Sequence, residues 1–488
     1  MPEDLSQPRD KQYPDYVYAR DPLVAVYQGT EGGKRAATVL LGEWLKAVDP
    51  DDLKPEAAKE RVHVKFRGGE GYVPIDAVTR QRQLEIYFID VDQGDSILIQ
   101  TPDDRRVLID GGKTDDALAF LTNKYRLDKE DNYVDLEAVV ATHSDKDHVG
   151  GLIDVLNHPK IAVKRVFHNG LFPTVKGLPD PGPRRTAAVD SDPTGPKRSR
   201  VFGLEDRPVL QDPQVLSDTM CDFVEAIDAA EKRLKTLLPE IEAAGGRADA
   251  PPGGFVCRRL DRADGYLPPF DAAHKHLQIE VLWPAAKTVD GEPCFRWYGS
   301  KGKTVNGNSV VLRVVHGGNT VLLSGDLNEP SMKEMLREYG ATVDAPGPLL
   351  ADVYKAAHHG SQHFDLGFLR VVAPNVGVIS SGDASYDEYA HPRAVLLGTI
   401  TRYSRHEMPA VFSTELAACF RKLGKEELNA FNAGTSVLYE RALKGIVHLR
   451  SDGEYLCLAT VHGKIPEGLT QEDQTTWTWD TWPDPSAH

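Results

Sequence analysis

One loop of this 488-residue chain places four potential metal ligands within six positions. His143, Asp145, Asp147 and His148 lie in the segment THSDKDHVGG, directly after the apolar run LEAVVA. Alternate residues of an extended loop point the same way, so the first three can converge while His148 turns toward a neighbouring position. Clustered carboxylates repel one another unless a cation offsets their charge, and imidazole with carboxylate suits zinc or manganese. The loop predicts a metal site; the alternative is a solvated acidic turn with two incidental histidines.

Two later segments also end apolar strands in possible ligands. VLLSGDL ends in Asp326, and YKAAHHGS ends in His358 and His359. Taken alone, an Asp after a strand is more often a turn residue, and a His pair is more often on the surface. Three such clusters in succession are harder to explain by chance, and strand ends are where α/β folds carry their chemistry. We therefore expect one site built from all three.

Residues 84–465 have the pattern of an α/β domain. Three apolar strands separated by Gly- and Asp-rich turns begin at Leu84, with a helix predicted at residues 115–127 between the second and the third. Further strand signals are LQIEVLWP, NSVVLRVVHGG, NTVLLSGDL, DVYKAAHHGS and NVGVISSG. The segment GIVHLRSDGEYLCLATV predicts a closing hairpin turned by Asp-Gly.

Other segments differ from this domain. Residues 1–15 are expected to be a flexible tail, residues 16–80 a small all-β module, and residues 466–488 a tail that packs by its tryptophans. Residues 171–275 are interpreted as an insertion, with a Pro- and Gly-rich stretch followed by a helix at 217–244. Basic side chains gather in that stretch: Lys176, Arg184, Arg185, Lys197, Arg198 and Arg200. They could track a phosphate backbone if they border the cleft; the plainer interpretation is a solvated, disordered loop.

Charge and cysteine content exclude some classes of protein. With 57 basic and 73 acidic side chains the net charge is -16, which argues against a general nucleic-acid coat protein. A nuclease stays open, because bound cations can reverse the field within one cleft. The cysteines are odd in number and lack CxxC spacing, as expected in a reducing cytoplasm: Cys221, Cys257, Cys294, Cys419 and Cys457. Neither a signal peptide nor an apolar run of about 18 residues is found, so we expect no membrane insertion.

Six motifs together resemble a known family. They are FIDVDQGDSILI, VLIDGG, THSDKDHVGG, NSVVL, LLSGD and HHGS, spread over residues 84 to about 400. In this order they resemble the metallo-β-lactamase superfamily, and within it soluble relatives of the nuclease-like domain of ComEC competence proteins. GEWLKAV and GYVPIDAV in the N-terminal module resemble strands of SH3-like barrels. The resemblance implies an α/β fold, the αββα four-layer sandwich, preceded by a small SH3-like barrel that binds a peptide or packs on its neighbour.

The resemblance also implies two divalent metal ions. His143 and Asp145 would hold one, Asp147 and His148 the other, with Asp326 bridging both and either His358 or His359 completing the second site. His168, after a predicted strand, is the candidate for a further ligand; the alternative is an ordinary turn residue. Asp145 stands where the wider superfamily usually has His, a departure shared by the ComEC-type branch. It leaves manganese an alternative to zinc.

The same resemblance implies hydrolysis. Two cations about 3.5 to 4 Å apart can share a water and hold it as the nucleophilic hydroxide. Asp147 would then be catalytic as well as a ligand, and Asp110 would orient the metal loop from behind. Whichever of His358 and His359 is not bound to metal, His359 by first choice, would donate a proton. His391 is a second candidate donor, or only a residue at a helix start, and Asn308 and Ser361 are candidate substrate contacts.

Three functions are compatible with these features. A phosphodiesterase or nuclease acting on DNA or another nucleic acid is favoured, because the motifs match the nuclease-like branch. A hydrolase of small phosphodiesters or esters is the second, with the helix at 217–244 as a lid. The third is a metal-stabilised scaffold whose SH3-like module binds a protein partner; the full set of ligands argues against it.

Overall fold

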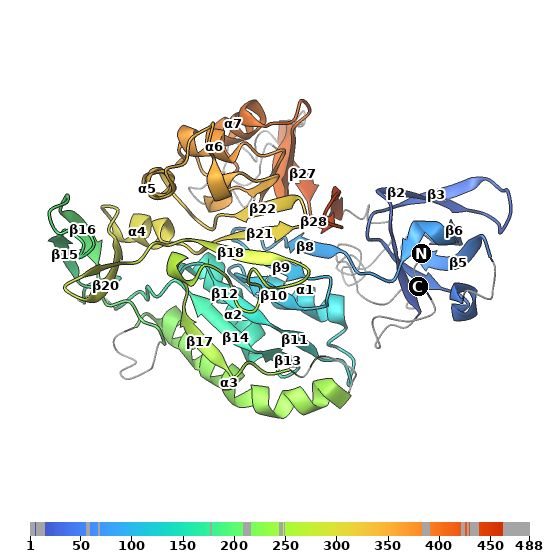
Figure 1. The fold of residues 1–488 in the computed structure, drawn as a ribbon, viewed down its shortest axis with the longest axis horizontal. Coiled ribbons are helices and arrows are strands. Elements are labelled where there is room, and N and C mark those ends of the chain that lie inside the picture. Colours follow the sequence, from blue (N-terminus) through green and yellow to red (C-terminus); the bar gives the residue numbers. More distant parts are fainter. Residues whose placement is uncertain are drawn as a thin grey trace.

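The computed structural model describes residues 5, 15–54, 59–66, 69–175, 178–207, 216–243, 247, 249–382, 391–420, 425–426, 429 and 439–461. An all-β module lies at one end of the molecule, a layered body in the middle, and a small sheet at the other end (Figure 1). Within these ranges, none of the helices combines the length and the hydropathy needed to cross a membrane. The predicted tryptophan-rich tail at 466–488 and most of the predicted tail at 1–15 lie outside the described residues.

The N-terminal module is one antiparallel sheet of seven strands in the order β3-β2-β6-β5-β4-β1-β7. Alternate side chains face an interior of its own, which includes Val24, Val62, Val64 and Val73. The strands are β1 (Tyr16–Ala19), β2 (Leu23–Tyr27), β3 (Arg35–Leu40), β4 (Trp44–Ala47), β5 (Arg61–Phe66), β6 (Gly69–Pro74) and β7 (Val78–Thr79).

An aromatic group of this module packs against the body. Tyr16, Tyr18 and Trp44 belong to the same buried cluster as Tyr87 of the body. The Trp44 indole Nε1 donates to Glu85 Oε1 at 3.3 Å, and Arg450 pairs with Glu43 at 2.9 Å. Of the two roles expected for the module, these contacts support packing on its neighbour. Its kinship with SH3-like barrels stays a prediction.

Two sheets form the centre of the body. The first has eight strands in the order β17-β14-β12-β10-β9-β8-β28-β29, and the second has six in the order β18-β21-β22-β23-β24-β25. The first contains β8 (Leu84–Phe88), β9 (Ile97–Gln100), β10 (Arg106–Ile109), β12 (Ala138–Ala141), β14 (Arg165–His168), β17 (Val256–Arg259), β28 (Ile446–Ser451) and β29 (Leu456–Val461). The second contains β18 (Gln278–Trp283), β21 (Val311–His316), β22 (Asn319–Leu323), β23 (Val353–Lys355), β24 (Val376–Ile379) and β25 (Ala410–Ser413). The predicted closing hairpin is confirmed as β28 paired with β29.

The two sheets pack face to face between two layers of helices. Ile86 and Val140 of the first sheet share a buried cluster with Val314 and Val353 of the second. The helices α1 (Asp116–Tyr125), α2 (Lys146–Asn157) and α3 (Asp218–Ala243) cover the outer face of the first sheet. The helices α5 (Glu329–Tyr339), α6 (Leu366–Val372) and α7 (Ala394–Tyr403) cover the outer face of the second sheet. Both faces of each sheet are therefore largely covered, which explains the nearly continuous apolar strands of its centre, and the layers follow the αββα order expected from the sequence (Figure 1).

The predicted insertion differs from expectation in two ways. Its helix, α3, is not a lid: Met220, Phe223 and Ile227 are buried against the outer face of the first sheet, and α3 packs on α2. Amphipathicity predicted this helix but could not identify the surface that it covers. The end of the segment supplies β17, which adds a parallel edge strand beside β14.

The arginine-rich stretch forms strands where a disordered loop was the plainer expectation. β15 (Arg184–Ala187) and β16 (Arg198–Val201) join β20 (Glu292–Arg296) and β19 (Lys287–Val289) in an antiparallel sheet. We call this sheet the arm; it lies at the end of the molecule opposite the N-terminal module (Figure 1). Lys176 lies outside the described residues.

The remaining elements are short or peripheral. They are β11 (Val134–Leu136) paired with β13 (Ile161–Val163), β26 (Glu415–Phe420) paired with β27 (Tyr439–Lys444), and α4 (Lys301–Gly307), which follows the arm. The single turns are η1 (Pro50–Leu53), η3 (Ile75–Ala77), η4 (Arg262–Asp264), η5 (Gly347–Leu349) and η6 (His358–Gly360).

Candidate metal centre

Parallel strand ends bring the predicted ligands together. In the first sheet β10, β12 and β14 run parallel, and in the second β22, β23 and β24 do. His143 follows β12, Asp326 follows β22, and His359 follows β23, so the three side chains meet where the carboxyl ends of the two sheets face each other. The sandwich thus converts three distant segments into one buried group.

The segment expected to be an extended loop enters α2 at Lys146, so Asp147 lies in the first turn of that helix, and close backbone packing fixes its position. The Gly94 φ is +143°, and a Cβ at this position would lie 2.4 Å from the Asp147 carbonyl oxygen. The amide of Asp95 donates to the same oxygen at 3.3 Å. Asp145 occupies the N-cap position of α2, yet its side chain accepts no capping hydrogen bond. That carboxylate is left to face His143.

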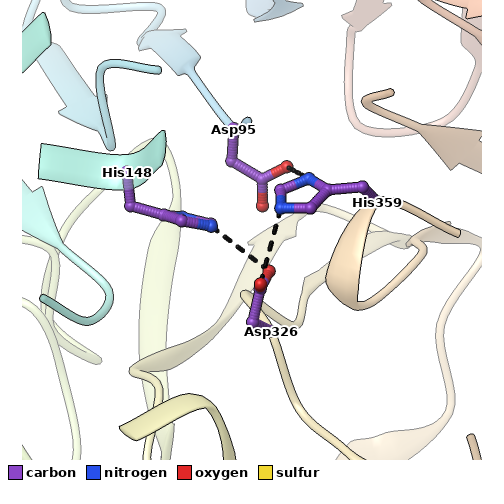
Figure 2. A group of neighbouring side chains, drawn as sticks. All are labelled: Asp95, His148, Asp326 and His359. Atoms are coloured by element: carbon purple, nitrogen blue, oxygen red, sulfur yellow. Dashed lines mark ion pairs between the residues drawn. The ribbon is translucent and has the colours of Figure 1, made fainter. Parts of the chain in front are cut away.

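Asp326 is common to two groups of side chains. Its Oδ2 lies 3.9 Å from His143 Nε2, which is itself 3.7 Å from Asp145 Oδ2. Its Oδ1 lies 3.4 Å from His148 Nε2, and its Oδ2 lies 3.4 Å from His359 Nε2. His359 Nε2 also lies 3.4 Å from Asp147 Oδ2. One group therefore contains His143 and Asp145, the other contains Asp147, His148 and His359, and both include Asp326. Figure 2 shows His148 and His359 of the second group beside Asp326.

These separations fit metal coordination. Donors held tetrahedrally at about 2.0 to 2.2 Å from zinc stand about 3.3 to 3.6 Å from one another. The Nε2 atoms of His143, His148 and His359 and the Oδ1 of Asp326 are buried and make no hydrogen bond within the described residues. Unpaired buried polar atoms are costly unless a ligand engages them. The residues present therefore fit divalent cations.

His148 is held in the tautomer that metal binding requires. Its Nδ1 lies 2.8 Å from Asp110 Oδ2, while the Thr142 amide and hydroxyl donate to the two Asp110 oxygens at 2.7 Å each. The carboxylate can only accept, so Nδ1 of His148 carries a proton, and Nε2, directed at Asp326, is the nitrogen that can bind a metal ion once its own proton is released. Asp110 thus has the position expected of a carboxylate that orients the metal loop.

His359 is oriented in the same way by Asp95, which the sequence analysis did not identify. His359 Nδ1 lies 3.2 Å from Asp95 Oδ1 and 3.3 Å from the Ser380 carbonyl oxygen. The second Asp95 oxygen is ion-paired with Lys355, which is fully buried in β23. Asp95 lies within the same cluster of potential ligands. Because its two oxygens face His359 Nδ1 and Lys355, we assign it an orienting role.

Geometry separates the two neighbouring histidines. The side chain of His359 is 1% exposed and has Asp95 behind its Nδ1, whereas His358 is 30% exposed, with its Nε2 3.9 Å from Asp326 Oδ2. Both residues adopt the left-handed conformation with φ of 52°, which is uncommon outside glycine. Such strain persists where surrounding structure imposes it, often at functional sites. His359 is therefore the better candidate ligand, and His358 lies at the rim.

Opposed charges shift the pKa values in this cluster. Burial alone would raise the pKa of Asp326, but His359 and His148 beside it bring the value well below the ordinary range. Burial would conversely lower the pKa of His148, and Asp326 and Asp110 raise it well above the ordinary value. Burial also opposes protonation of His359, whose pKa Asp326 and Asp95 raise. The carboxylates that hold protons on these imidazoles would equally attract cations.

Two other predicted histidines have distinct surroundings. His168 ends β14; its Nδ1 accepts from the Gly170 amide at 3.0 Å, and no hydrogen bond or ion pair joins it to the cluster in the described part of the chain. Its buried Nε2 has no hydrogen-bond partner there, and burial lowers its pKa to about 3. His391 lies at the rim with its ring 5.9 Å from that of His358. Burial first, then His359 and His358, lower its pKa to about 4.

The predicted substrate contacts are engaged elsewhere. Asn308 is 1% exposed, and its Nδ2 donates to the carbonyl oxygens of Arg296 at 3.0 Å and Thr304 at 2.7 Å, so it caps α4. Ser361 is 4% exposed and its hydroxyl bonds the His363 ring at 3.2 Å. Neither side chain is presented to a substrate.

Asn306 reaches the cluster instead of Asn308. Its Nδ2 lies 3.5 Å from Asp326 Oδ2, and with the amide turned over it donates to Asp145 Oδ2 at 3.2 Å and to the Gly302 carbonyl at 2.6 Å.

Two of the residues that the sequence analysis missed had signals in the sequence. Asp95 belongs to the motif FIDVDQGDSILI, and Lys355 is a charged residue inside an apolar strand. A charge in such a strand requires a buried partner.

Comparison with known proteins agrees with this geometry. Residues 89–212 match the family model described as the metallo-beta-lactamase superfamily. The chain is 41% identical over 88 residues to competence protein ComA of Neisseria gonorrhoeae, which is 18% of this chain and 12% of that protein. It is 25% identical over 338 residues to ComE operon protein 3 of Bacillus subtilis (strain 168), covering 66% of this chain and 31% of that one. The chain therefore spans less than a third of either relative.

Among solved structures, a mutant of the CmlA beta-hydroxylase aligns with a TM-score of 0.27 and 7% identity, over 69% of this chain and 53% of that one. A score this low does not inform the site.

Proposed function

We propose that the chain is a two-metal phosphodiesterase acting on nucleic acid, because residues 89–212 match the metallo-beta-lactamase superfamily model and part of the chain is similar to a competence protein. Hydrolysis is the general activity of this superfamily. The finer proposal concerns the number of metal ions and the bond that is cut.

One observation carries the proposal: Asp326 is shared by two sets of donors. His143 and Asp145 would hold one cation with it, and Asp147, His148 and His359 would hold the other. Three carboxylates stand among imidazoles that become neutral when they bind a metal ion, and two divalent ions would offset the remaining negative charge. Zinc is our first choice, and the carboxylate-rich first group keeps manganese an alternative.

Two bound ions would lower the pKa of a shared water and polarise the phosphodiester oxygens. The residues of the chain have to orient the ligands, hold the substrate and manage protons. Asp110 and Asp95 fix the rings of His148 and His359, so that little reorganisation is needed when the transition state forms. Asn306 can hold the Asp145 carboxylate in place.

We assign proton donation to the leaving oxygen to His358 rather than His359. His358 is partly exposed at the rim, and its Nδ1 makes no hydrogen bond within the described residues. His359 has both ring nitrogens directed at the cluster or its orienting carboxylate. His391 lies beside His358 and would position its ring.

A nucleic-acid substrate is preferred over a small ester. The small-ester alternative relied on a lid at 217–244, but α3 is buried against the outer face of the first sheet. The scaffold alternative predicts a degraded site, whereas two independent carboxylates orient the histidines of this one. Binding of a protein partner by the N-terminal module is not part of the proposal, because its Trp44 already contacts the body.

A substrate panel with elemental analysis tests the proposal. Protein reconstituted with zinc or manganese should cleave single-stranded DNA or RNA and also bis(p-nitrophenyl) phosphate. Asp326→Ala should lose metal and abolish both activities, since it removes the donor common to both groups. Asp51→Ala, at a side chain that is 73% exposed in the N-terminal module, is the matched control. Cleavage of nitrophenyl esters alone, or full activity in Asp326→Ala, would contradict the proposal.

A further inference from the structure

The arm carries three arginines directly opposite one another on three neighbouring strands. Arg185 of β15 pairs with Arg200 of β16, and Arg200 pairs with Arg296 of β20. Arg198 lies two residues before Arg200, so its side chain is on the same face. We call these four residues the arginine row. Like charges directly across a sheet are destabilising, so the row needs an explanation beyond the fold.

The carboxylates near the row are too few to neutralise it. Arg185 pairs with Glu292 and lies 3.8 Å from Asp290, and Arg296 lies 3.7 Å from Glu334, so three carboxylates face four guanidinium groups. In the ranges that the structure describes, no carboxylate lies within ion-pair distance of Arg198 or Arg200. Arg200 is only 6% exposed, and its Nε has no hydrogen-bond partner there. A buried guanidinium nitrogen without an acceptor is a group that an incoming anion would satisfy.

Neighbouring groups keep the row in place. The Arg185 guanidinium lies over the ring of Phe202 at 3.8 Å, which fixes its plane. Burial first, and then the neighbouring Arg198 and Arg200, lower the pKa of Arg296 despite Glu334. The positive charges are therefore concentrated on one face of a chain whose net charge is -16. A local excess of this kind selects an anionic partner against the overall field.

The arm is also attached to the candidate metal centre. Arg296 ends β20, and its carbonyl oxygen accepts from Asn308 Nδ2 at 3.0 Å. Asn308 caps α4, the helix that presents Asn306 to Asp145 and Asp326. The Tyr298 amide adds a hydrogen bond to Thr304 of the same helix at 3.0 Å. A ligand bound along the row is thereby held by the segment that borders the cluster.

We infer that the arginine row binds the phosphate backbone of a nucleic-acid strand and leads it to the metal centre. Guanidinium groups bind phosphate oxygens in pairs, and three neighbouring strands spread the row over about 10 Å, wider than one phosphate. Backbone contacts of this kind position a strand without reading its sequence. The inference rests on the proposed function for the cleavage that follows binding, but binding can be measured separately.

Fluorescence anisotropy with a labelled single-stranded DNA of about 20 nucleotides, in EDTA, measures binding without hydrolysis. The test variant is Arg185→Glu/Arg198→Glu, which leaves the buried Arg200 in place. The matched control is Arg184→Glu, on the same strand but the opposite face, where Arg184 lies over Trp297 at 4.4 Å. We expect at least about tenfold weaker binding in the double variant, and a salt dependence reduced by about 1.4 in log-log slope for two lost phosphate contacts. The control should stay within about twofold of wild type, because it removes no contact of the row.

An RNA strand of the same sequence should bind similarly, because the contacts are to phosphate. Equal binding by wild type and double variant, an equal loss in the control, or no binding by wild type would each overturn the inference. Turnover of bis(p-nitrophenyl) phosphate by metal-loaded wild type separates the two proposals. If the ester is turned over and wild type and double variant bind the strand equally well, only the role of the arginine row is refuted. Row-dependent binding without any turnover would refute only the hydrolase.

Discussion

The buried pair of Asp95 and Lys355 yields a prediction that separates stability from metal binding. Their side chains are 2% and 0% exposed and are ion-paired across 260 positions of the chain. The other Asp95 oxygen lies 3.2 Å from His359 Nδ1. Asp95 therefore neutralises Lys355 and orients His359. Within the described residues, the Lys355 ammonium group pairs with Asp95 and with no other carboxylate.

Three variants distinguish these two roles. Asp95→Ala should cost about 3 to 5 kcal/mol of unfolding free energy, because it leaves the Lys355 charge buried and unpaired. Lys355→Met should also be destabilising, because it leaves the Asp95 carboxylate buried without its cation, although His359 still faces Asp95. Asp95→Ala/Lys355→Met removes both charges and should recover much of that loss. Metal affinity should follow a different order: about 10- to 100-fold weaker in both variants that lack Asp95, and close to wild type in Lys355→Met.

Urea unfolding of the metal-free protein and competition titration against a chromophoric chelator supply the two measurements. Asp51→Ala serves as the control for removal of an exposed carboxylate. If the double variant recovered stability and also bound metal as tightly as wild type, Asp95 would have no orienting role. If both single variants were as stable as wild type, the account of the buried pair would be wrong.

Three other predictions concern different parts of the structure. Asp110→Ala removes the 2.8 Å partner of His148 Nδ1 and should weaken metal binding about 10- to 100-fold by calorimetric titration; unchanged affinity would contradict the role of Asp110. Because the pKa values of His148 and His359 are raised in the metal-free fold, the folded state holds extra protons above about pH 6.5. Its thermal stability in EDTA should thus fall as pH rises through the folded pKa values, and metal binding should release protons; a His359→Gln variant with the same pH dependence would count against this. Trp44→Ala should cost about 3 to 5 kcal/mol by opening a cavity between the N-terminal module and the body, and chemical unfolding with wild-type stability would contradict the packed interface.

Much of the candidate site could be predicted from sequence because its ligands follow apolar strands. His143 and Asp326 follow β12 and β22, Asp147 and His148 lie at the start of the helix after β12, and parallel strands bring such ends to one edge of a sheet. Asp110 followed from its motif. The choice between His358 and His359 required coordinates, because adjacent residues in a strained turn point in different directions and only His359 meets Asp95.

The rest depends on contacts between distant segments. In the sequence, Lys355 is a charged residue in an apolar strand with no visible partner. Its partner becomes evident once the residues before β9 are placed against β23, where Asp95 faces Lys355. The Pro- and Gly-rich composition near Arg184 favoured a loop, yet β20 supplies a partner strand for β16 from much later in the chain. The pattern of α3 predicted a helix with one apolar face, but not that α2 and β13 would cover it.

Anomalous diffraction from crystals of the zinc- or manganese-reconstituted protein tests the central claim most directly. The account predicts two peaks on either side of Asp326, one beside His143 and Asp145 and the other beside Asp147, His148 and His359. Both should disappear or weaken strongly in Asp326→Ala. An absence of peaks at this cluster, or one peak that persists in the variant, would contradict the two-metal centre.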